Sequence, residues 1–597
     1  MSAEGALTVT RRPSGAAGPP DAGRARRARR RWALAFVLGW LGQVGIRVWL
    51  ASGQTLPVAT PDESGYLFAA RVLTGGPDAD MSYGTVYRAG YPLLLLPAFW
   101  ADDPVTVYRG ALVINALISA LMLPLAFLLL RRLSVAARPA YLFAHVTALL
   151  PGVLFYSLFV LTDAILPVVV AGWLLLAHAW LSAPRDPEGR RAAVRLALYG
   201  TGGSLLVGFA YASHSRGAIL LVVHGVVLLA GALLRRRSWR GTILAGAVAA
   251  AAVLAGALLN RLVVIPHLYP AGDNDLGGNL VERLTTVDGF AWMTSLATGQ
   301  VWYQAVATGG VAAIGLVAAA FAVVRRDVAV PLRVLALAVL ATVAGIALAT
   351  SAALPVEYRI GNYVYGRYLA CVTPVLFMAG VAVLLRVPRR TLAAAVAAAA
   401  ALTVAAAGVV QWYAGDLLGE YTFTIYDFPE TSFLTWDWDS FHLWHATLAG
   451  LGILAAAAAA VLLPRHGAPV LAALLAAVAL AMTITAVDRI ARPLVAEQTA
   501  ETDLRGSVDL RGRDTIAVDW NVPWTMRLSH YYWAWWSDGT LFDSRWTPPP
   551  QDADMIVLAW PRDVPAADSW PGGAPSGWEI VDTRRTPEGN WVAWARA

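Results

Sequence analysis

Repeated apolar runs of about 20 residues constrain the fold of this chain more than any other feature of its sequence. These runs consist almost entirely of Ala, Leu, Val and Gly. A run of about 18 or more apolar residues is long enough to cross the hydrocarbon core of a bilayer as a helix. Only 14% of the 597 residues are charged, whereas soluble domains carry roughly 25%. Most of the chain is therefore predicted to lie in a membrane as a bundle of helices.

About thirteen membrane-spanning helices are predicted by this length criterion. They lie near residues 32–51, 105–130, 138–157, 159–181, 193–211, 216–234, 241–263, 301–324, 330–353, 366–387, 391–412, 446–463 and 468–487. Arginine clusters occupy alternate loops, beginning with "RARRARRR" before the first span. By the positive-inside rule, these loops and the N-terminus are cytoplasmic. An odd number of spans then places the C-terminal end outside, in a multi-pass protein of the plasma membrane.

Composition divides the chain into three parts. Residues 1–31, rich in Arg, Pro, Gly and Ala, are predicted to form a disordered, basic cytoplasmic tail. Residues 32–487 form the transmembrane domain, with a long first outer loop at 52–104. In residues 488–597 charged residues return, and "TIAVDW", "MIVLAW", "GWEIVDT" and "GNWVAWA" are typical of short strands. The predicted fold is an all-α polytopic membrane protein with a small extracytoplasmic α/β domain at its C-terminus.

The net charge of +7 does not indicate a nucleic-acid-binding protein, because the arginine clusters follow the positive-inside pattern of a membrane protein. The single cysteine, Cys371, lies inside a predicted span. A disulfide framework and a Cys/His metal site are therefore excluded.

Two adjacent carboxylates, Asp62 and Glu63, occur in "TPDESGYLFAARVLTGG" (60–76), shortly after the first span. A purely structural interpretation explains this stretch. Thr60 is a suitable N-cap, Pro61 suits the first helical position, and Glu63 completes a capping box. A catalytic interpretation depends on what else lies at the same side of the membrane.

Further ionisable residues are predicted at the outer ends of the spans. They are Arg88, Asp163, His214, Arg216 and Arg367. Ionisable groups at such depths are costly and tend to face the protein interior at functional sites. Each also has a structural interpretation: Asp163 can pair with an arginine, His214 can be structural, and the arginines can extend to the headgroups. Together they predict a cavity that is acidic on one wall and basic on another.

Such a cavity suits group transfer from a lipid phosphate. Arginines can bind the phosphate and stabilise the charge that grows on the leaving group. A carboxylate opposite can accept the proton of an attacking hydroxyl.

The "DE" of the first outer loop, the acidic residue of the fourth span, "SHSRG" and "GRYLACVTPVLFMAG" together resemble the GT-C superfamily. These are membrane glycosyltransferases that use polyprenyl-phosphate sugars. The pattern is similar to the branch with protein O-mannosyltransferases, lipid A aminoarabinose transferases and actinobacterial cell-wall transferases. The resemblance covers roughly residues 32–390.

This resemblance implies roles for individual residues. Asp62 would be the catalytic base, with Glu63 as its alternative. Arg216 and Arg367 would bind the lipid phosphate, assisted by His214 and Arg88. Asp62 and Glu63 can also hold Mg²⁺ or Mn²⁺ among water molecules, but their spacing does not require a cation.

Outer aromatic residues occur in "YYWAWWSDG" at 531–539. Four of them are predicted to stack on a saccharide acceptor: Tyr531, Trp533, Trp535 and Trp536. Trp and Tyr also form the aromatic belt at membrane interfaces, but this stretch belongs to the predicted outer domain, which favours the saccharide.

The predicted function is an inverting glycosyltransferase that moves a sugar from a polyprenyl-phosphate donor to a glycan, glycolipid or protein of the cell envelope. One alternative is a transporter or flippase of lipid-linked saccharides, although transporters place charges near the bilayer midplane in related halves. Another is a glycan-binding scaffold, which would need the outer aromatic residues but not the carboxylates.

Overall fold

The computed structural model describes residues 22–185, 187–274 and 277–597. Within these ranges ten helical segments are long and apolar enough to cross a membrane, and up to thirteen if each of three bent pairs is one span. The ten are α1 (Ala22–Leu50), α4 with α5 (Pro104–Ser119, Met122–Arg132), α8 (Leu166–Ser182), α9 (Arg190–Ser213), α10 (Arg216–Leu233), α11 with α12 (Trp239–Leu259, Ile265–Leu268), α16 (Val330–Ala353), α19 (Arg389–Ala414), α22 (Leu443–Val461) and α23 with α24 (Gly467–Ala486, Arg492–Thr502). The chain is thus a multi-pass membrane protein, as its composition predicts.

The three bent pairs are α6 with α7 (Ala137–Leu149, Pro151–Leu154), α14 with α15 (Val287–Ala307, Val311–Val324) and α17 with α18 (Gly361–Val364, Thr373–Arg386). Shorter helices outside the spans are α2 (Asp62–Leu73), α3 (Pro92–Leu95), α13 (Gly277–Thr285), α20 (Leu417–Glu420), α21 (Pro429–Thr435) and α25 (Trp524–Trp533). Each of the thirteen predicted runs falls on one of these spans or bent pairs.

The first helix begins earlier than the sequence suggests. Residues 22–31 belong to α1 and not to the expected disordered tail, of which residues 1–21 lie outside the described residues. Ala and Arg are among the best helix formers, so the helix of the first span can extend through this arginine-rich stretch.

The predicted span 301–324 is broken inside the bent pair of α14 and α15. The two helices meet at 119°. Gly309 and Gly310 join them with φ angles of 55° and 74°, a left-handed conformation that glycine adopts without steric cost. An apolar run shows its length but not such a bend, so the break could not be deduced from hydropathy.

The C-terminal domain begins after residue 502 and not at 488, because α23 and α24 form one helical segment from Gly467 to Thr502. Its five strands are β1 (Thr515–Asp519), β2 (Asp538–Phe542), β3 (Met555–Ala559), β4 (Trp578–Arg585) and β5 (Asn590–Arg596). They form one sheet in the order β2-β1-β3-β5-β4. The strand β1 pairs in parallel with β2 and β3, and β5 pairs antiparallel with β3 and β4. The predicted α/β domain is confirmed.

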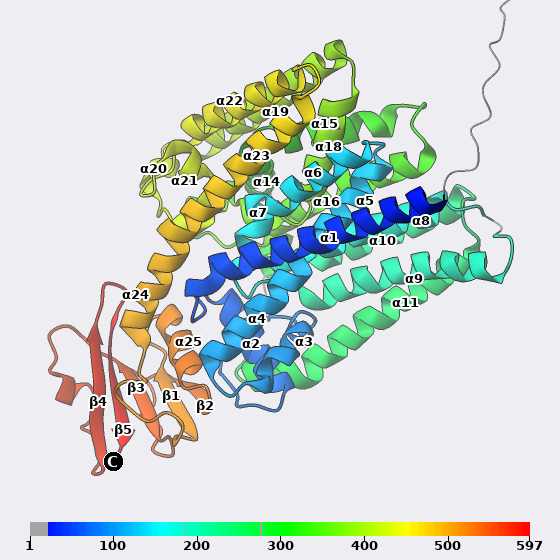
Figure 1. Cartoon of the computed structure of the whole chain (residues 1–597). Helices are drawn as coiled ribbons and strands as arrows, with labels where there is room; N and C mark the ends of the chain where they lie inside the picture. Colours follow the sequence, from blue (N-terminus) through cyan, green and yellow to red (C-terminus); the bar gives the residue numbers. More distant parts are fainter. Residues whose placement is uncertain (1–21, 186, 275–276) are drawn as a thin grey trace, which may run out of the picture.

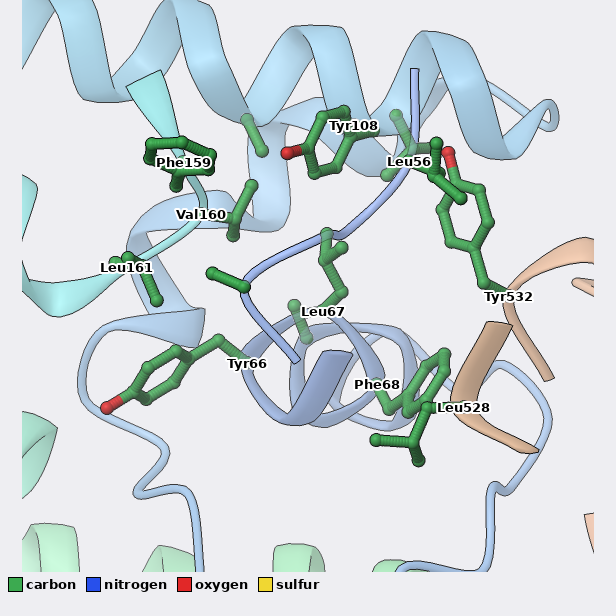
Figure 2. Packing of buried hydrophobic residues seen from close by; sticks show 14 of the residues in the cluster. Leu56, Tyr66, Leu67, Phe68, Tyr108, Phe159, Val160, Leu161, Leu528 and Tyr532 are labelled. Carbon is green, nitrogen blue, oxygen red and sulfur yellow. The ribbon is translucent and has the colours of Figure 1, made fainter. Parts of the chain in front are cut away.

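This domain packs against the end of the helix bundle that carries α2 and α3 (Figure 1). In Figure 2, Leu67 and Phe68 of α2 lie between Tyr108 of α4 and Leu528 of α25. The Tyr532 hydroxyl donates to the Thr55 carbonyl oxygen over 2.6 Å. The C-terminal domain and the first long loop therefore share one apolar core.

Two glycines allow a close approach between α15 and α18. A Cβ atom at Gly315 would overlap the carbonyl oxygen of Leu376, and one at Gly380 would overlap that of Val311. Small residues permit such backbone contact between membrane helices.

We expect Gly315→Ala to destabilise the bundle by about 1–3 kcal/mol, the usual cost of overpacking. The midpoint of thermal unfolding in detergent should fall. Gly408→Ala is the matched control, because a Cβ atom at Gly408 meets no heavy atom within 4 Å. Equal midpoints for the two variants would contradict this packing.

Candidate active site

The helix α2 places Asp62 and Glu63 in its first turn, where their side chains have different surroundings. Pro61 occupies the N-cap position and no side chain caps the helix, so the capping box expected from Thr60 and Glu63 does not form. The helix starts one residue later than that motif requires, and its N-cap residue, Pro61, has no backbone N–H group for Glu63 to bind. All residues of α2 from Glu63 to Val72 are buried.

Glu63 is a buried structural carboxylate. It accepts hydrogen bonds from the backbone N–H groups of Val58, Ala59 and Val160 at 2.9, 2.8 and 2.6 Å, and from the Tyr108 hydroxyl at 2.7 Å. Burial raises the pKa of the Glu63 carboxyl, and these hydrogen bonds oppose the shift. With its oxygens used in this way, Glu63 fastens the loop before α2 and is not available as the alternative base.

Asp62 faces the opposite way and is the more accessible of the two. Its Oδ1 accepts a hydrogen bond from the Tyr87 hydroxyl at 2.9 Å. Its Oδ2 lies 2.6 Å from Nη2 of Arg367, and 31% of the side chain is exposed. The carboxylate is therefore held in a defined position and still reaches open space.

Asp163 forms ion pairs with two arginines, one of which also binds Asp62. Its Oδ1 lies 2.9 Å from Nη1 of Arg216, and its Oδ2 lies 3.0 Å from Nε of Arg367. The Asp163 side chain is fully buried, and the two guanidinium groups are 1% and 10% exposed. Four groups predicted from separate parts of the sequence thus form one continuous ionic cluster, Asp62–Arg367–Asp163–Arg216.

His214 and Arg88 lie beside this cluster. The Nδ1 atom of His214 accepts a hydrogen bond from the backbone N–H of Arg216 at 3.0 Å. The Nη1 atom of Arg88 donates to the Tyr211 carbonyl oxygen at 2.7 Å, and its guanidinium carbon lies 4.6 Å from the Tyr211 ring centroid. Among the described residues, Arg88 has no carboxylate partner, which leaves a positive charge at the edge of the cluster.

The four aromatic residues predicted to stack on a saccharide lie at the end of α25 and directly after it. Tyr531, Trp533 and Trp535 are buried, so their ring faces are not available to a sugar in this structure. Trp535 packs 5.8 Å from Phe99. Trp536 is half-buried and donates to Asp102 at 2.9 Å. Trp535 and Trp536 thus attach the C-terminal domain to the loop 52–104, whereas the Tyr531 hydroxyl and the Trp533 indole donate to Thr540 and Thr502.

A cation shared by Asp62 and Glu63 does not fit the geometry. Their carboxylates point to different partners, Arg367 for Asp62 and Tyr108 for Glu63. No group of three or more His, Cys, Asp or Glu side chains suited to a metal ion occurs within the described ranges.

Two polar residues near the cluster were not identified from the sequence. Tyr426 and Asp427 lie on the short helix η7 (Ile425–Asp427), in the loop between α19 and α22. Burial raises the pKa of the Asp427 carboxyl to about 6, although the charges of Arg359 and Arg367 oppose the shift. A single Tyr–Asp pair in a loop has no periodicity or motif, so only the tertiary structure relates it to the site.

Comparison with solved structures identifies the architecture. ArnT from Cupriavidus metallidurans, bound to undecaprenyl phosphate, superposes with a TM-score of 0.50 at 16% sequence identity, covering 95% of this chain and 98% of that one. The chain shares the fold of this ArnT. The resemblance predicted from the sequence is thereby confirmed at the level of the fold.

Two further structures are similar to a lesser degree. The apo state of the same ArnT has a TM-score of 0.49 at 15% identity, over 96% of this chain and 98% of that one. The Archaeoglobus fulgidus oligosaccharyltransferase in complex with Zn and sulfate has a TM-score of 0.31 at 16% identity, over 67% and 55%. Neither the protein-family models nor the sequences of curated proteins match the chain.

We expect Asp163→Asn to destabilise the protein by about 3–5 kcal/mol, because the buried arginines would lose their common counter-charge. The midpoint of thermal unfolding in detergent should fall clearly below that of the wild type. Asp62→Asn is the comparison, since its partly exposed carboxylate contributes less to stability. A larger loss with Asp62→Asn than with Asp163→Asn would contradict the central position of Asp163.

Proposed function

We propose that this protein is a membrane glycosyltransferase that moves a sugar from a polyprenyl-phosphate donor to an acceptor of the cell envelope. The observation that carries the proposal is the cluster in which the accessible Asp62 meets the buried Arg367, Asp163 and Arg216. The GT-C fold and the undecaprenyl phosphate bound to the similar ArnT support a lipid-linked donor.

The reaction proceeds by displacement at C1 of the sugar. The oxygen of an acceptor hydroxyl attacks C1 while the bond between C1 and the phosphate oxygen breaks. The hydroxyl proton passes to the Asp62 carboxylate, which acts as general base. The electron pair of the broken bond stays on the phosphate, and polyprenyl phosphate leaves with one additional negative charge. Attack opposite the leaving group inverts the configuration at C1.

The arginines stabilise the leaving phosphate. Arg367 donates to Asp62 and Asp163 in this structure. A phosphate that competes for the Arg367 guanidinium would release Asp62 for proton transfer. Charge-assisted hydrogen bonds of this kind are stronger than neutral ones and oppose the charge of the leaving group.

The donor phosphate needs one more cation. Two carboxylates and two guanidinium groups make the four-residue cluster neutral at physiological pH. Arg88 lies at its edge without a carboxylate partner in the described part of the chain, and it therefore supplies the positive charge that attracts the phosphate.

The acceptor is a glycan, a glycolipid or a protein reached from the extracytoplasmic face. The end of the bundle that carries Asp62 and the C-terminal domain faces outward in this proposal, because the arginine-rich loops lie in the cytoplasm under the positive-inside rule.

We expect Asp62→Asn to abolish sugar transfer, because an amide cannot accept the hydroxyl proton. The measurement uses proteoliposomes with radiolabelled polyprenyl-phosphate sugars and compares wild type with the variant at equal insertion. Label should appear in product only with the wild type. The labelled lipid that yields this product then identifies the donor sugar. If neither protein transfers label while lipid-linked sugar crosses the bilayer, the protein is a transporter and the proposal fails.

We expect Arg88→Gln to weaken binding of undecaprenyl phosphate about tenfold, the effect of losing about 1.4 kcal/mol of interaction. Arg88→Lys should retain part of the affinity, since lysine keeps the positive charge but lacks the planar set of N–H donors of the guanidinium. The affinity is measured by titrating the lipid into detergent-purified protein. Arg562→Gln, on the exposed surface of the C-terminal domain, is the control and should bind as the wild type does.

A further inference from the structure

Tyr426 and Asp427 lie near the ionic cluster, in the loop between α19 and α22. The mechanism proposed above uses no residue of this loop. The Tyr426 ring packs against Phe159 and Tyr156, with ring centroids 5.3 and 6.2 Å apart. The guanidinium carbon of Arg367 lies 5.9 Å from the centroid of the same Tyr156 ring. Tyr426 and Arg367 are thus neighbours around one aromatic side chain.

Asp427 reaches the segment that carries Arg367 from the other side. Its Oδ2 lies so close to Gly361 that a Cβ atom there would overlap it, and the Tyr365 ring lies 3.7 Å from the same position. The Tyr365 hydroxyl in turn accepts a hydrogen bond from Nη1 of Arg367 at 3.3 Å. Asp427 therefore borders the residues that position the Arg367 guanidinium.

Both side chains hold a buried polar atom that forms no hydrogen bond within the described ranges. These atoms are the Tyr426 hydroxyl oxygen and Oδ2 of Asp427. Asp427 as a whole is only 5% exposed. Buried polar atoms are almost always hydrogen-bonded, and each one without a partner requires an explanation.

The structural explanation for Asp427 would be an ion pair with Arg359. However, Nε of Arg359 lies 2.6 Å from Glu357, and among the described residues no ion pair joins Arg359 to Asp427. Burial raises the pKa of Asp427 to about 6 even though the charges of Arg359 and Arg367 lower it. The carboxyl is therefore only partly compensated by its surroundings.

We propose that Asp427 and Tyr426 bind hydroxyl groups of the sugar that the donor carries. This inference rests on the proposed function, in which Arg367 holds the donor phosphate. The sugar is bonded directly to that phosphate, so its hydroxyl groups lie within a few ångströms of the groups around Arg367. A sugar hydroxyl donates to the carboxylate oxygen of Asp427, and the Tyr426 hydroxyl both donates and accepts.

A subsite of this kind would contribute to sugar specificity. A site built to hydrogen-bond a hydroxyl rejects ligands that lack it, because its buried polar groups are then left without partners. Polyprenyl phosphate without a sugar gains nothing from Asp427, whereas the sugar-bearing lipid does.

The experiment compares the affinities of two lipids for the full-length protein in detergent. The probes are undecaprenyl phosphate and undecaprenyl phosphate carrying the sugar that the wild type transfers, each titrated into wild type, Asp427→Asn and Tyr426→Phe. We expect Asp427→Asn to bind the sugar-bearing lipid at least about tenfold more weakly, the loss of a hydrogen bond to a charged group, and Tyr426→Phe about fivefold more weakly, the loss of a neutral one. Undecaprenyl phosphate should bind as before. Tyr426→Phe removes only the hydroxyl and serves as the second test if Asp427→Asn folds poorly.

Asp437→Asn is the matched control. Asp437 belongs to the same loop, its side chain is 32% exposed, and it binds His442 over 2.8 Å. This variant should bind both lipids as the wild type does.

The inference is overturned if both lipids lose affinity equally, because the residues would then act on the phosphate or on the fold. It is also overturned if both lipids bind normally, even where transfer is lost, since the hydroxyl would then belong to the acceptor. A failure of the proposed function gives a different result, in which the wild type transfers no sugar from any of the labelled donors.

Discussion

The site depends on the two ion pairs of Asp163. This carboxylate binds Arg216, 53 residues away in sequence, and Arg367, 204 residues away. A single buried charge between two guanidinium groups is costly to desolvate, and such an arrangement is retained only where its geometry is well satisfied. It fixes the start of α10 against the segment before α18. Because Asp163 binds Nε of Arg367 and Tyr365 accepts from Nη1, the third nitrogen, Nη2, is directed at Asp62.

The second requirement is the burial of α2. Its apolar face packs against α4 and α25, and Glu63 anchors the loop before it through four hydrogen bonds. The C-terminal domain contributes to this packing directly, through Leu528 and Tyr532 (Figure 2). It therefore supports the helix that carries Asp62. Three of the four aromatic side chains predicted to stack on a saccharide, Tyr531, Trp533 and Trp535, are buried.

Much of the architecture could be predicted from the sequence, because hydropathy and composition act locally. The apolar runs define the spans, and the β-rich stretches define β1, β3, β4 and β5. The helix α25 and the strand β2 were not predicted, because the aromatic-rich stretch that contains them has no clear hydrophobic period. The ionisable residues Asp62, Asp163, Arg216 and Arg367 stand out for the same local reason, which is that charge is costly beside apolar spans.

The sequence by itself determined that this chain crosses a membrane many times and gathers ionisable groups at the ends of its spans. Only the tertiary structure decided what each group does there. Asp62 and Glu63 are neighbours in sequence, yet the Asp62 carboxylate is partly exposed, whereas the Glu63 carboxylate is buried and fully hydrogen-bonded. Tyr426 and Asp427 join the site without any local signal. The partners that separate these cases come from distant segments, and hydrogen bonds and ion pairs form only where folding brings such segments within about 3 Å of each other.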